Sequence, residues 1–291
     1  MNGEVIQVDA FTREPGKGNP AGVVLNGDDF TDVQMQAIAK KVGFNECVFV
    51  CHSEKADIRL RYFTPGHETP LCGHATVGAI FLLSYQKEAD QQWLVETEAG
   101  ILTVSYRSAG QQITMQQSDA RLLPFTGSRE QLCRVIGIQT DDLYEGMPIQ
   151  YGNTGSWTLI VPVKSEAVLD RMMPETQEFP EALPDRPSSS IHPFAFLNAS
   201  KDVYTARHFS SPYSGTVEDS VTGTASGVMG AYLMTHYYLE ERSKEITVLQ
   251  GKHVGREGLL TVKTLRAADG HHHVTITGSA SLNKSLSIEI D

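Results

Sequence analysis

The sequence is poor in cysteine, in positive charge and in long apolar runs, and each shortage excludes a class of protein. Four cysteines in 291 residues are too few for a disulfide scaffold, so reduced thiols are expected. Lys and Arg number 24 against 35 Asp and Glu, a net charge of −11, and the basic residues form no cluster. Binding to nucleic acid or to an anionic membrane surface is therefore not expected. No apolar run approaches the roughly 18 residues of a membrane-spanning helix, and the first residues do not resemble a signal peptide, so we expect a cytoplasmic protein.

Several catalytic and ligand-binding motifs are missing as well. The Gly-X-Ser-X-Gly pattern of serine hydrolases does not occur, and the segment Gly16–Gly22 has neither Walker A nor dinucleotide-loop spacing, so it is interpreted as a turn. His67, Cys72 and His74 could bind zinc in principle, but no fourth ligand follows at a diagnostic spacing. We therefore expect no cofactor and no metal.

What the sequence does contain is an internal duplication. With 40% hydrophobic and 20% charged residues, the chain is typical of a globular protein with one large domain or two domains of roughly 140 residues. Five short strings recur in the same order in the second half, and five collinear matches indicate two copies of one architecture. The matched strings are Gly18-Asn19 with Gly152-Asn153, Arg61-Tyr62-Phe63-Thr64 with Arg207-His208-Phe209-Ser210, Gly73-His74-Ala75-Thr76 with Gly223-Thr224-Ala225-Ser226, Gly100–Val104 with Gly258–Val262, and Ile113-Thr114-Met115 with Val274-Thr275-Ile276.

Two helices that are apolar on every side are expected at the centres of these halves. They cover residues 73–85 and 223–234, and a soluble helix of this kind must be surrounded by other elements. Short β-rich runs bounded by Gly, Pro, Asn and Asp lie around both of them. The predicted fold class is α+β, with two domains related by a pseudo-twofold axis. Each domain is a curled, barrel-like mixed β-sheet around one central helix.

The expected domain boundaries follow from the same pattern. The first domain covers 1–120 together with a last strand at about 280–291, and the second covers 121–279. A capping box at Thr31–Gln34 and a terminating Gly43 predict an amphipathic surface helix in the first domain. The Pro-rich stretch Pro174–Pro193 is interpreted as a long surface excursion of the second domain.

The starts of the two apolar helices are candidate anion sites. The helices begin with Gly73-His74 and Gly223-Thr224, where the first-turn amides lack intrahelical partners and the helix dipole favours a carboxylate or phosphate. If the halves are related by a twofold axis, both helix starts face one cleft, where a small-molecule site is expected. The alternative is that the glycines only form tight turns from strand to helix.

Polar residues beside these helix starts are the first catalytic candidates. Asp219 precedes the second helix and His74 lies in the first turn of the other. Histidine is a poor N-cap, and its titration range suits proton transfer. For Asp219, a role as a simple helix N-cap is an open alternative.

Glu46 is the third catalytic candidate. It precedes the apolar run Cys47–Cys51, and the period-two pattern of a strand places it on the face of Val48 and Val50. If that face is buried, desolvation is expected to raise the pKa of Glu46 toward neutrality, as suits a general acid/base. The alternative is that Glu46 lies in solvent just before the strand.

These motifs together resemble the PhzF-like (phenazine biosynthesis) family within the diaminopimelate epimerase-like superfamily. The resemblance covers essentially the whole chain. It is carried by Val8-Asp9-Ala10-Phe11-Thr12, Gly18-Asn19-Pro20-Ala21-Gly22, Asn45-Glu46, Arg61-Tyr62-Phe63-Thr64-Pro65, Cys72-Gly73-His74-Ala75-Thr76 and Glu218-Asp219-Ser220-Val221-Thr222-Gly223.

The resemblance implies a two-domain fold with the active site between the domains, and commonly a homodimer. It implies isomerisation of trans-2,3-dihydro-3-hydroxyanthranilate without a cofactor, with Glu46 as the catalytic glutamate. The other site positions of the family match Gly73, His74, Asp219 and Thr224, with Thr in place of the more usual Ser. Gly223 and Cys72 are expected to contact the substrate as well.

The main functional prediction is a cofactor-independent isomerase of a small, carboxylated, unsaturated substrate. Glu46 would move a proton, helped by His74 and Asp219, while helix amides hold the carboxylate. One alternative is a cofactor-independent amino-acid racemase or epimerase with Cys72 as a base. The epimerase branch uses two thiols, however, and no sulfur lies near Asp219 at the second position. Another alternative is a binding protein for small carboxylates that has no turnover.

Overall fold

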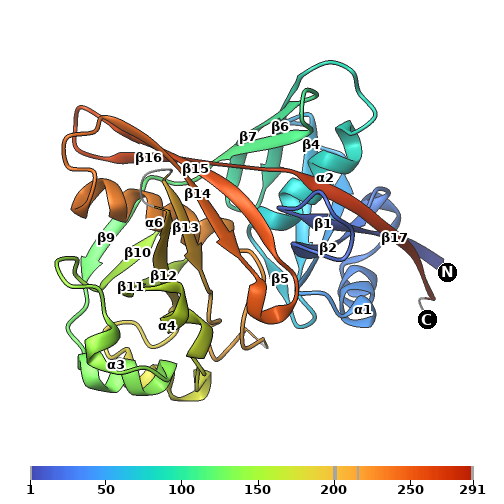
Figure 1. Cartoon of the computed structure of the whole chain (residues 1–291). Coiled ribbons are helices and arrows are strands. Elements are labelled where there is room, and N and C mark those ends of the chain that lie inside the picture. The colour runs from blue at the N-terminus through green and yellow to red at the C-terminus, as the bar shows by residue number, and fades with distance from the viewer. Residues whose placement is uncertain (1, 199–201, 215, 290–291) are drawn as a thin grey trace. The chain divides into compact units, whose positions relative to one another are not determined.

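The computed structural model describes residues 2–198, 202–214 and 216–289 and divides into two compact units (Figure 1). The first unit comprises Met1–Gln116 and Thr277–Asp291, and the second comprises Gln117–Ile276. Within the described residues, no helix is both long enough and apolar enough to cross a membrane.

The first unit is a curled mixed sheet around one helix. Its helices are α1 (Asp32–Val42) and α2 (Gly73–Ser84), with a 3-10 turn, η1 (Gly27–Asp29). Its strands are β1 (Asn2–Ala10), β2 (Asn19–Val24), β3 (Glu46–Cys51), β4 (Ile58–Phe63), β5 (Glu68–Thr69), β6 (Gln91–Thr97), β7 (Gly100–Arg107), β8 (Gln112–Gln116) and β17 (Ala280–Glu289).

The helix α2 is wrapped by strands, as its apolar sequence predicts. It packs against β1, β2, β3, β7, β8 and β17 of its own unit, and nine of its twelve residues are buried. The amphipathic α1 lies on the outer face, where Met35, Ile38 and Ala39 are buried in a cluster with β3 residues. The predicted capping box at Thr31 and the left-handed C-cap at Gly43 (φ 72°) are both present.

The second unit repeats this plan with additional outer helices. Its helices are α3 (Arg129–Ile136), α4 (Glu166–Arg171), α5 (Phe179–Ala182) and α6 (Gly223–His236), with 3-10 turns η2 (Thr140–Asp142), η3 (Thr176–Glu178) and η5 (Lys252–Val254). Its strands are β9 (Arg121–Pro124), β10 (Gln150–Asn153), β11 (Trp157–Pro162), β12 (Ser190–Asn198), β13 (Val203–Ala206), β14 (Ser243–Gln250), β15 (Gly258–Arg266) and most of β16 (His272–Gly278). The helix α6 packs against β10, β11, β14 and β15.

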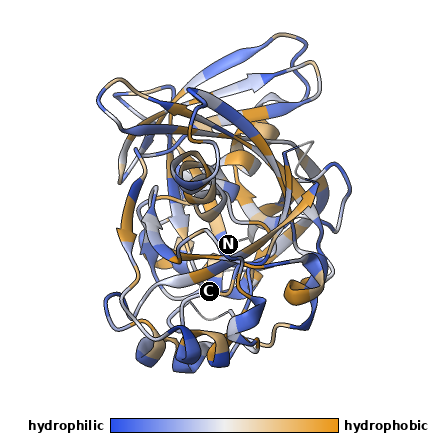
Figure 2. Ribbon diagram, turned by 60° about the vertical axis from the view of Figure 1, so that its left-hand side comes forward, coloured by the Kyte–Doolittle hydropathy of each residue, from blue (hydrophilic) through white to orange (hydrophobic). Residues whose placement is uncertain are grey.

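The order of strand pairings is the same in both units. In the first, β17, β1, β2, β3, β4, β6 and β7 pair in that order, and in the second β9, β10, β11, β12, β13, β14 and β15 do. In both series the third and fifth pairings are parallel and the others antiparallel. This shared order is the structural expression of the duplication. Hydrophobic and hydrophilic residues alternate along many strands, as expected for sheets with one face toward a core (Figure 2).

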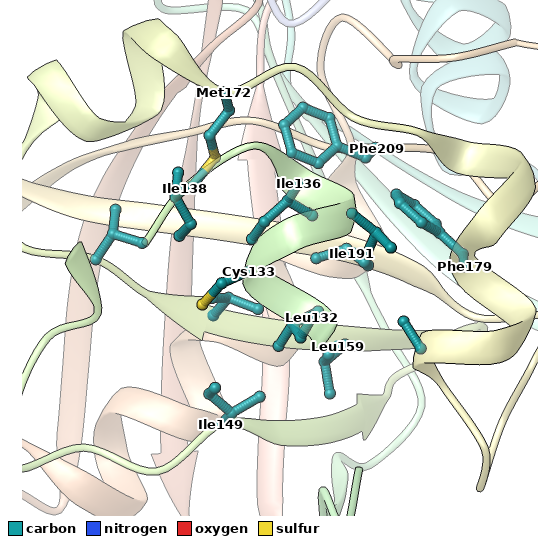
Figure 3. Close-up of a cluster of buried hydrophobic side chains, with 14 of the residues drawn as sticks. Leu132, Cys133, Ile136, Ile138, Ile149, Leu159, Met172, Phe179, Ile191 and Phe209 are labelled. Carbon is teal, nitrogen blue, oxygen red and sulfur yellow. The ribbon is translucent and has the colours of Figure 1, made fainter. Parts of the chain in front are cut away.

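The segment 174–193 is not the surface excursion predicted from its prolines. It forms η3, α5 and the start of β12, and Phe179, Ala182 and Leu183 are fully buried. Figure 3 shows Phe179 in one cluster with Ile136 of α3 and Ile191 of β12. The prediction was wrong because it rested on the prolines alone and overlooked the apolar residues between them, whose burial is favourable.

Candidate active site

Glu46 is the first residue of β3 and points to the start of α2. The parallel register of β2 and β3 sets it beside Ala21, and 22% of its side chain is exposed. Its Oε2 lies 3.2 Å from Nε2 of His74. The alternative that Glu46 lies in solvent ahead of the strand is therefore not what the structure shows.

Cys72 and His74 complete a compact cluster with this carboxylate. Cys72 is the N-cap of α2, but its side chain makes no capping hydrogen bond. Its Sγ instead lies 3.4 Å from Nδ1 of His74, and both residues are buried. The helix start at Gly73 brings the imidazole to the first residue of β3. A carboxylate, an imidazole and a thiol therefore meet where the first-turn amides of α2 are uncapped by Cys72.

The protonation states of Glu46 and His74 are coupled. Burial by itself raises the pKa of Glu46, but the charge and hydrogen bond of His74 outweigh it, so this pKa lies below its usual range. Burial likewise opposes charging of His74, yet Cys72 and Glu46 together raise the pKa of His74 well above that of a free histidine. The predicted rise in the pKa of Glu46 was wrong, because the neighbouring imidazolium could not be seen from the sequence. Each of the two groups thus favours the charged form of the other.

The pKa of the Cys72 thiol is raised in this environment. Burial is the main reason that its pKa is raised, and the nearby charge of Glu46 raises it further. A raised pKa lowers the fraction of thiolate, which is the form that could accept a proton. This disfavours the racemase alternative, which requires Cys72 to remove a proton.

The same three side chains are the described residues that could hold a metal ion. Glu46, Cys72 and His74 each offer one ligand atom, and these atoms lie within 4.8 Å of one another. His67, which the sequence analysis considered as a ligand, instead contacts the Thr64 hydroxyl through its Nδ1 at 3.2 Å.

In the second unit, Asp219 is held by the residue before α6. The hydroxyl of Thr222, the N-cap, donates to Oδ2 of Asp219 at 2.5 Å rather than to the helix amides. The Thr222 side chain therefore does not cap the helix that begins at Gly223. The hydroxyl of Thr224, in the first turn, lies 3.5 Å from that of Ser156.

A forked ion pair anchors the segment before each helix, and the sequence analysis missed both. Arg61 binds both oxygens of Glu68 at 2.8 and 2.7 Å, and Arg207 binds both oxygens of Glu218 at 3.0 and 2.6 Å. Each glutamate lies five residues before the first glycine of its helix. The repeated Arg-X-Phe strings, together with this equal spacing, could have identified the forks.

The structure brings four of the predicted site residues together in the first unit and three in the second. Glu46, Cys72, Gly73 and His74 share one cluster. Asp219, Gly223 and Thr224 lie at the start of α6.

Comparisons with known proteins agree with this architecture. Residues 8–285 match the family described as phenazine biosynthesis-like protein. The chain is 47% identical over 293 residues to the uncharacterized isomerase YfhB of Bacillus subtilis, with 99% of each chain covered. It is 29% identical over 278 residues, or 94% of each chain, to the trans-2,3-dihydro-3-hydroxyanthranilate isomerase of Pseudomonas chlororaphis.

Solved structures give the same result. A phenazine biosynthesis protein of the PhzF family from Bacillus anthracis is similar over 100% of both chains, with a TM-score of 0.95 and 43% identity. A hydroxyproline epimerase from Agrobacterium vitis covers 99% of this chain and 91% of its own, with a TM-score of 0.64. At 12% identity the second likeness concerns the fold alone. The predicted epimerase-like fold class is confirmed.

Proposed function

Because the chain belongs to the phenazine biosynthesis-like protein family and its relatives are isomerases, we propose that it moves a proton on a small, carboxylated, unsaturated substrate. The substrate class is that of trans-2,3-dihydro-3-hydroxyanthranilate. The observation that carries the proposal is the Glu46 carboxylate 3.2 Å from the His74 imidazole at the uncapped start of α2.

The reaction needs only one group that both removes and returns a proton. The Glu46 carboxylate takes a proton from a saturated carbon beside the double bonds, and the electron pair of that C–H bond enters the π-system. The double bond shifts, and the Glu46 carboxylic acid returns the proton to a carbon farther along. One C–H bond breaks and one forms, so no oxidant or reductant is needed.

The neighbouring groups assist this transfer. The His74 imidazole in its charged form stabilises the Glu46 carboxylate before and after the transfer, and the neighbouring Cys72 and Glu46 raise the pKa of His74. Amides at the start of α2 bind the substrate carboxylate, because the helix dipole favours an anion there. We assign Asp219 a supporting role in this proton transfer, because the family resemblance implies a site residue at its position. A homodimer in solution also remains a prediction.

The racemase alternative requires a second thiol opposite Cys72. The N-cap of α6 is Thr222, whose hydroxyl is a far weaker acid than a thiol, so a two-thiol mechanism has no second base there. The raised pKa of Cys72 argues against the first base as well.

The test follows the double bonds of trans-2,3-dihydro-3-hydroxyanthranilate by NMR. Wild-type protein is expected to shift them, and Cys72→Ser is expected to keep turnover within about tenfold of wild type, because Cys72 is not the base. Complete loss of turnover in Cys72→Ser would favour the racemase mechanism. Binding of the compound with no change in its double bonds would favour the non-catalytic alternative.

A further inference from the structure

We propose that Gln250, the last residue of β14, is a positioning residue that holds Asp219 and Thr222 in place before α6. The inference rests on the proposed function, in which Asp219 takes part in the reaction. The side chain of Gln250 is buried, with only 3% of the residue exposed.

Three hydrogen bonds join this amide to the segment 219–222. Its Oε1 accepts from the Thr222 backbone N–H at 3.2 Å, and its Nε2 donates to the Asp219 carbonyl at 2.9 Å. The same Nε2 lies 3.3 Å from the Thr222 hydroxyl oxygen. One side chain thus binds both ends of the short segment that carries the carboxylate.

These bonds also orient the Thr222 hydroxyl. Its oxygen accepts from Gln250, so its single proton is directed to the Asp219 carboxylate, 2.5 Å away. Gln250 therefore acts on Asp219 in two ways, through the main chain and through Thr222. Removing the amide takes away these three hydrogen bonds and leaves the carboxylate chemically intact.

The turn after Gln250 is built for close approach to the same segment. Gly251 has a φ of 97°, a conformation that favours glycine. A Cβ there would lie 2.2 Å from the Arg256 carbonyl oxygen and 2.9 Å from that of Ser220. The end of β14 is thereby packed against the main chain between Asp219 and Thr222.

The first unit shows that the fold itself does not require this arrangement. Gln250 lies opposite Gly258 in the β14–β15 ladder, as Thr97 lies opposite Gly100 in the β6–β7 ladder. The Thr97 hydroxyl donates to Gly100 of its own hairpin at 2.8 Å. Both units have the Arg–Glu fork before the central helix. The hydrogen bonds from Gln250 occur in the second unit, where the segment before the helix carries Asp219.

The experiment compares Gln250→Leu with Thr97→Val in the full-length protein. The first measurement needs no substrate and records amide hydrogen exchange at residues 219–223. We expect the Thr222 amide to exchange at least about tenfold faster in Gln250→Leu, and no change there in Thr97→Val. Unchanged exchange in Gln250→Leu would overturn the proposal.

The second measurement separates positioning from general stability. With trans-2,3-dihydro-3-hydroxyanthranilate, Gln250→Leu is expected to lower kcat at least about tenfold and to change KM less than about threefold. In an Asp219→Asn background the same substitution is expected to lower kcat less than about twofold, since its effect passes through Asp219. An equal loss of kcat in both backgrounds would show that Gln250 is merely structural.

If Gln250→Leu does not fold, Gln250→Glu replaces it, because Glu keeps the acceptor for the Thr222 amide and loses both donors. The same coupling with Asp219→Asn is then expected. If wild-type protein does not act on the compound, the proposed function fails, and the exchange measurement alone decides whether Gln250 holds the segment.

Discussion

The two units share one plan of strands and differ in what they place at the start of the central helix. When the two units are aligned at Phe63 and Phe209 of the repeated strings, their ladders give the other equivalent residues. In the first unit the registers link residues of β1, β2, β3 and β4 in turn, and in the second they link residues of β10, β11, β12 and the stretch that follows β13. The equivalent pairs are Val8 and Gly152, Ala21 and Thr158, Glu46 and Ser190, Val48 and His192, Tyr62 and His208, and Phe63 and Phe209.

At the start of the central helix, equivalent positions of the two units carry side chains of different chemistry. The first unit has Glu46, Cys72 and His74, and the matching residues of the second are Ser190, Thr222 and Thr224. An ionisable cluster in one unit thus corresponds to three hydroxyl groups in the other. The fold supplies a helix start of the same kind twice, and the side chains that surround it differ between the two units.

The largest expected effect concerns Glu46. Glu46→Gln keeps the shape and the hydrogen bonding of the side chain but cannot carry a proton, so turnover is expected to fall at least about a hundredfold. The control is Ser190→Ala, the equivalent position of the second unit, which is expected to leave turnover nearly unchanged. Steady-state kinetics with trans-2,3-dihydro-3-hydroxyanthranilate measure both. Near-normal turnover in Glu46→Gln would remove this residue from the mechanism.

The next effect concerns packing between the sheet and the central helix. In the first unit Val8 of β1 faces Gly78 of α2, and in the second Gly152 of β10 faces Val228 of α6. The large and the small residue have changed places at equivalent strand positions. A Cβ on Gly152 would lie 2.1 Å from Cγ1 of Val228, whereas a Cβ on Gly78 would lie 3.5 Å from its nearest neighbour, on Val8.

Matched alanine variants measure this difference. Gly152→Ala is expected to lower the free energy of unfolding by about 1 to 3 kcal/mol through overpacking. Gly78→Ala has room and improves helix propensity, so it is expected to be neutral or stabilising by up to about 1 kcal/mol. Neither glycine has a positive φ, so backbone strain does not complicate the comparison. Urea unfolding decides it, and equal effects of the two variants would contradict the proposed packing.

The sequence predicts the parts of this comparison that depend on local pattern. The helices α2 and α6 were recognisable because they are apolar on all sides, and α1 because its capping box and Gly43 are local signals. The wrapping sheets follow from the need to cover such helices. Four of the five repeated strings fall on equivalent elements.

The parts that failed depend on contacts between distant residues. Gly18-Asn19 was matched to Gly152-Asn153, but the ladders make Ala21 equivalent to Thr158, which sets Asn19 against Ser156. The lowered pKa of Glu46 depends on a histidine 28 positions away in the chain. The contacts of Gln250 with Asp219 are likewise long-range, and no periodicity in the sequence reports them.

The smallest expected effect is a difference in pH response between the units. His192 and His208 of the second unit are buried, with Nδ1 atoms 3.3 Å apart. Burial holds the pKa of His192 well below its usual range, and mutual proximity lowers it further. Burial also lowers the pKa of His208, although Asp219 and Glu218 partly oppose this. His74 of the first unit has a raised pKa.

The signs of the two responses are therefore opposite. A histidine with a lowered pKa stabilises the fold above its unfolded pKa of about 6.5, and that stability is lost as the pH falls below this value. A histidine with a raised pKa stabilises the fold below about pH 6.5 and loses that contribution as the pH rises through its folded pKa.

Acidification from pH 7 to 5 should therefore lower the protection of α6 amides and leave the His74 contribution to α2 intact. Hydrogen exchange, corrected for intrinsic rates, measures each helix. His192→Val introduces the residue of the equivalent position, Val48, and should weaken the acid response of α6. An acid response of equal size in α2 and α6, unaffected by His192→Val, would show that the buried histidine pair is not its source.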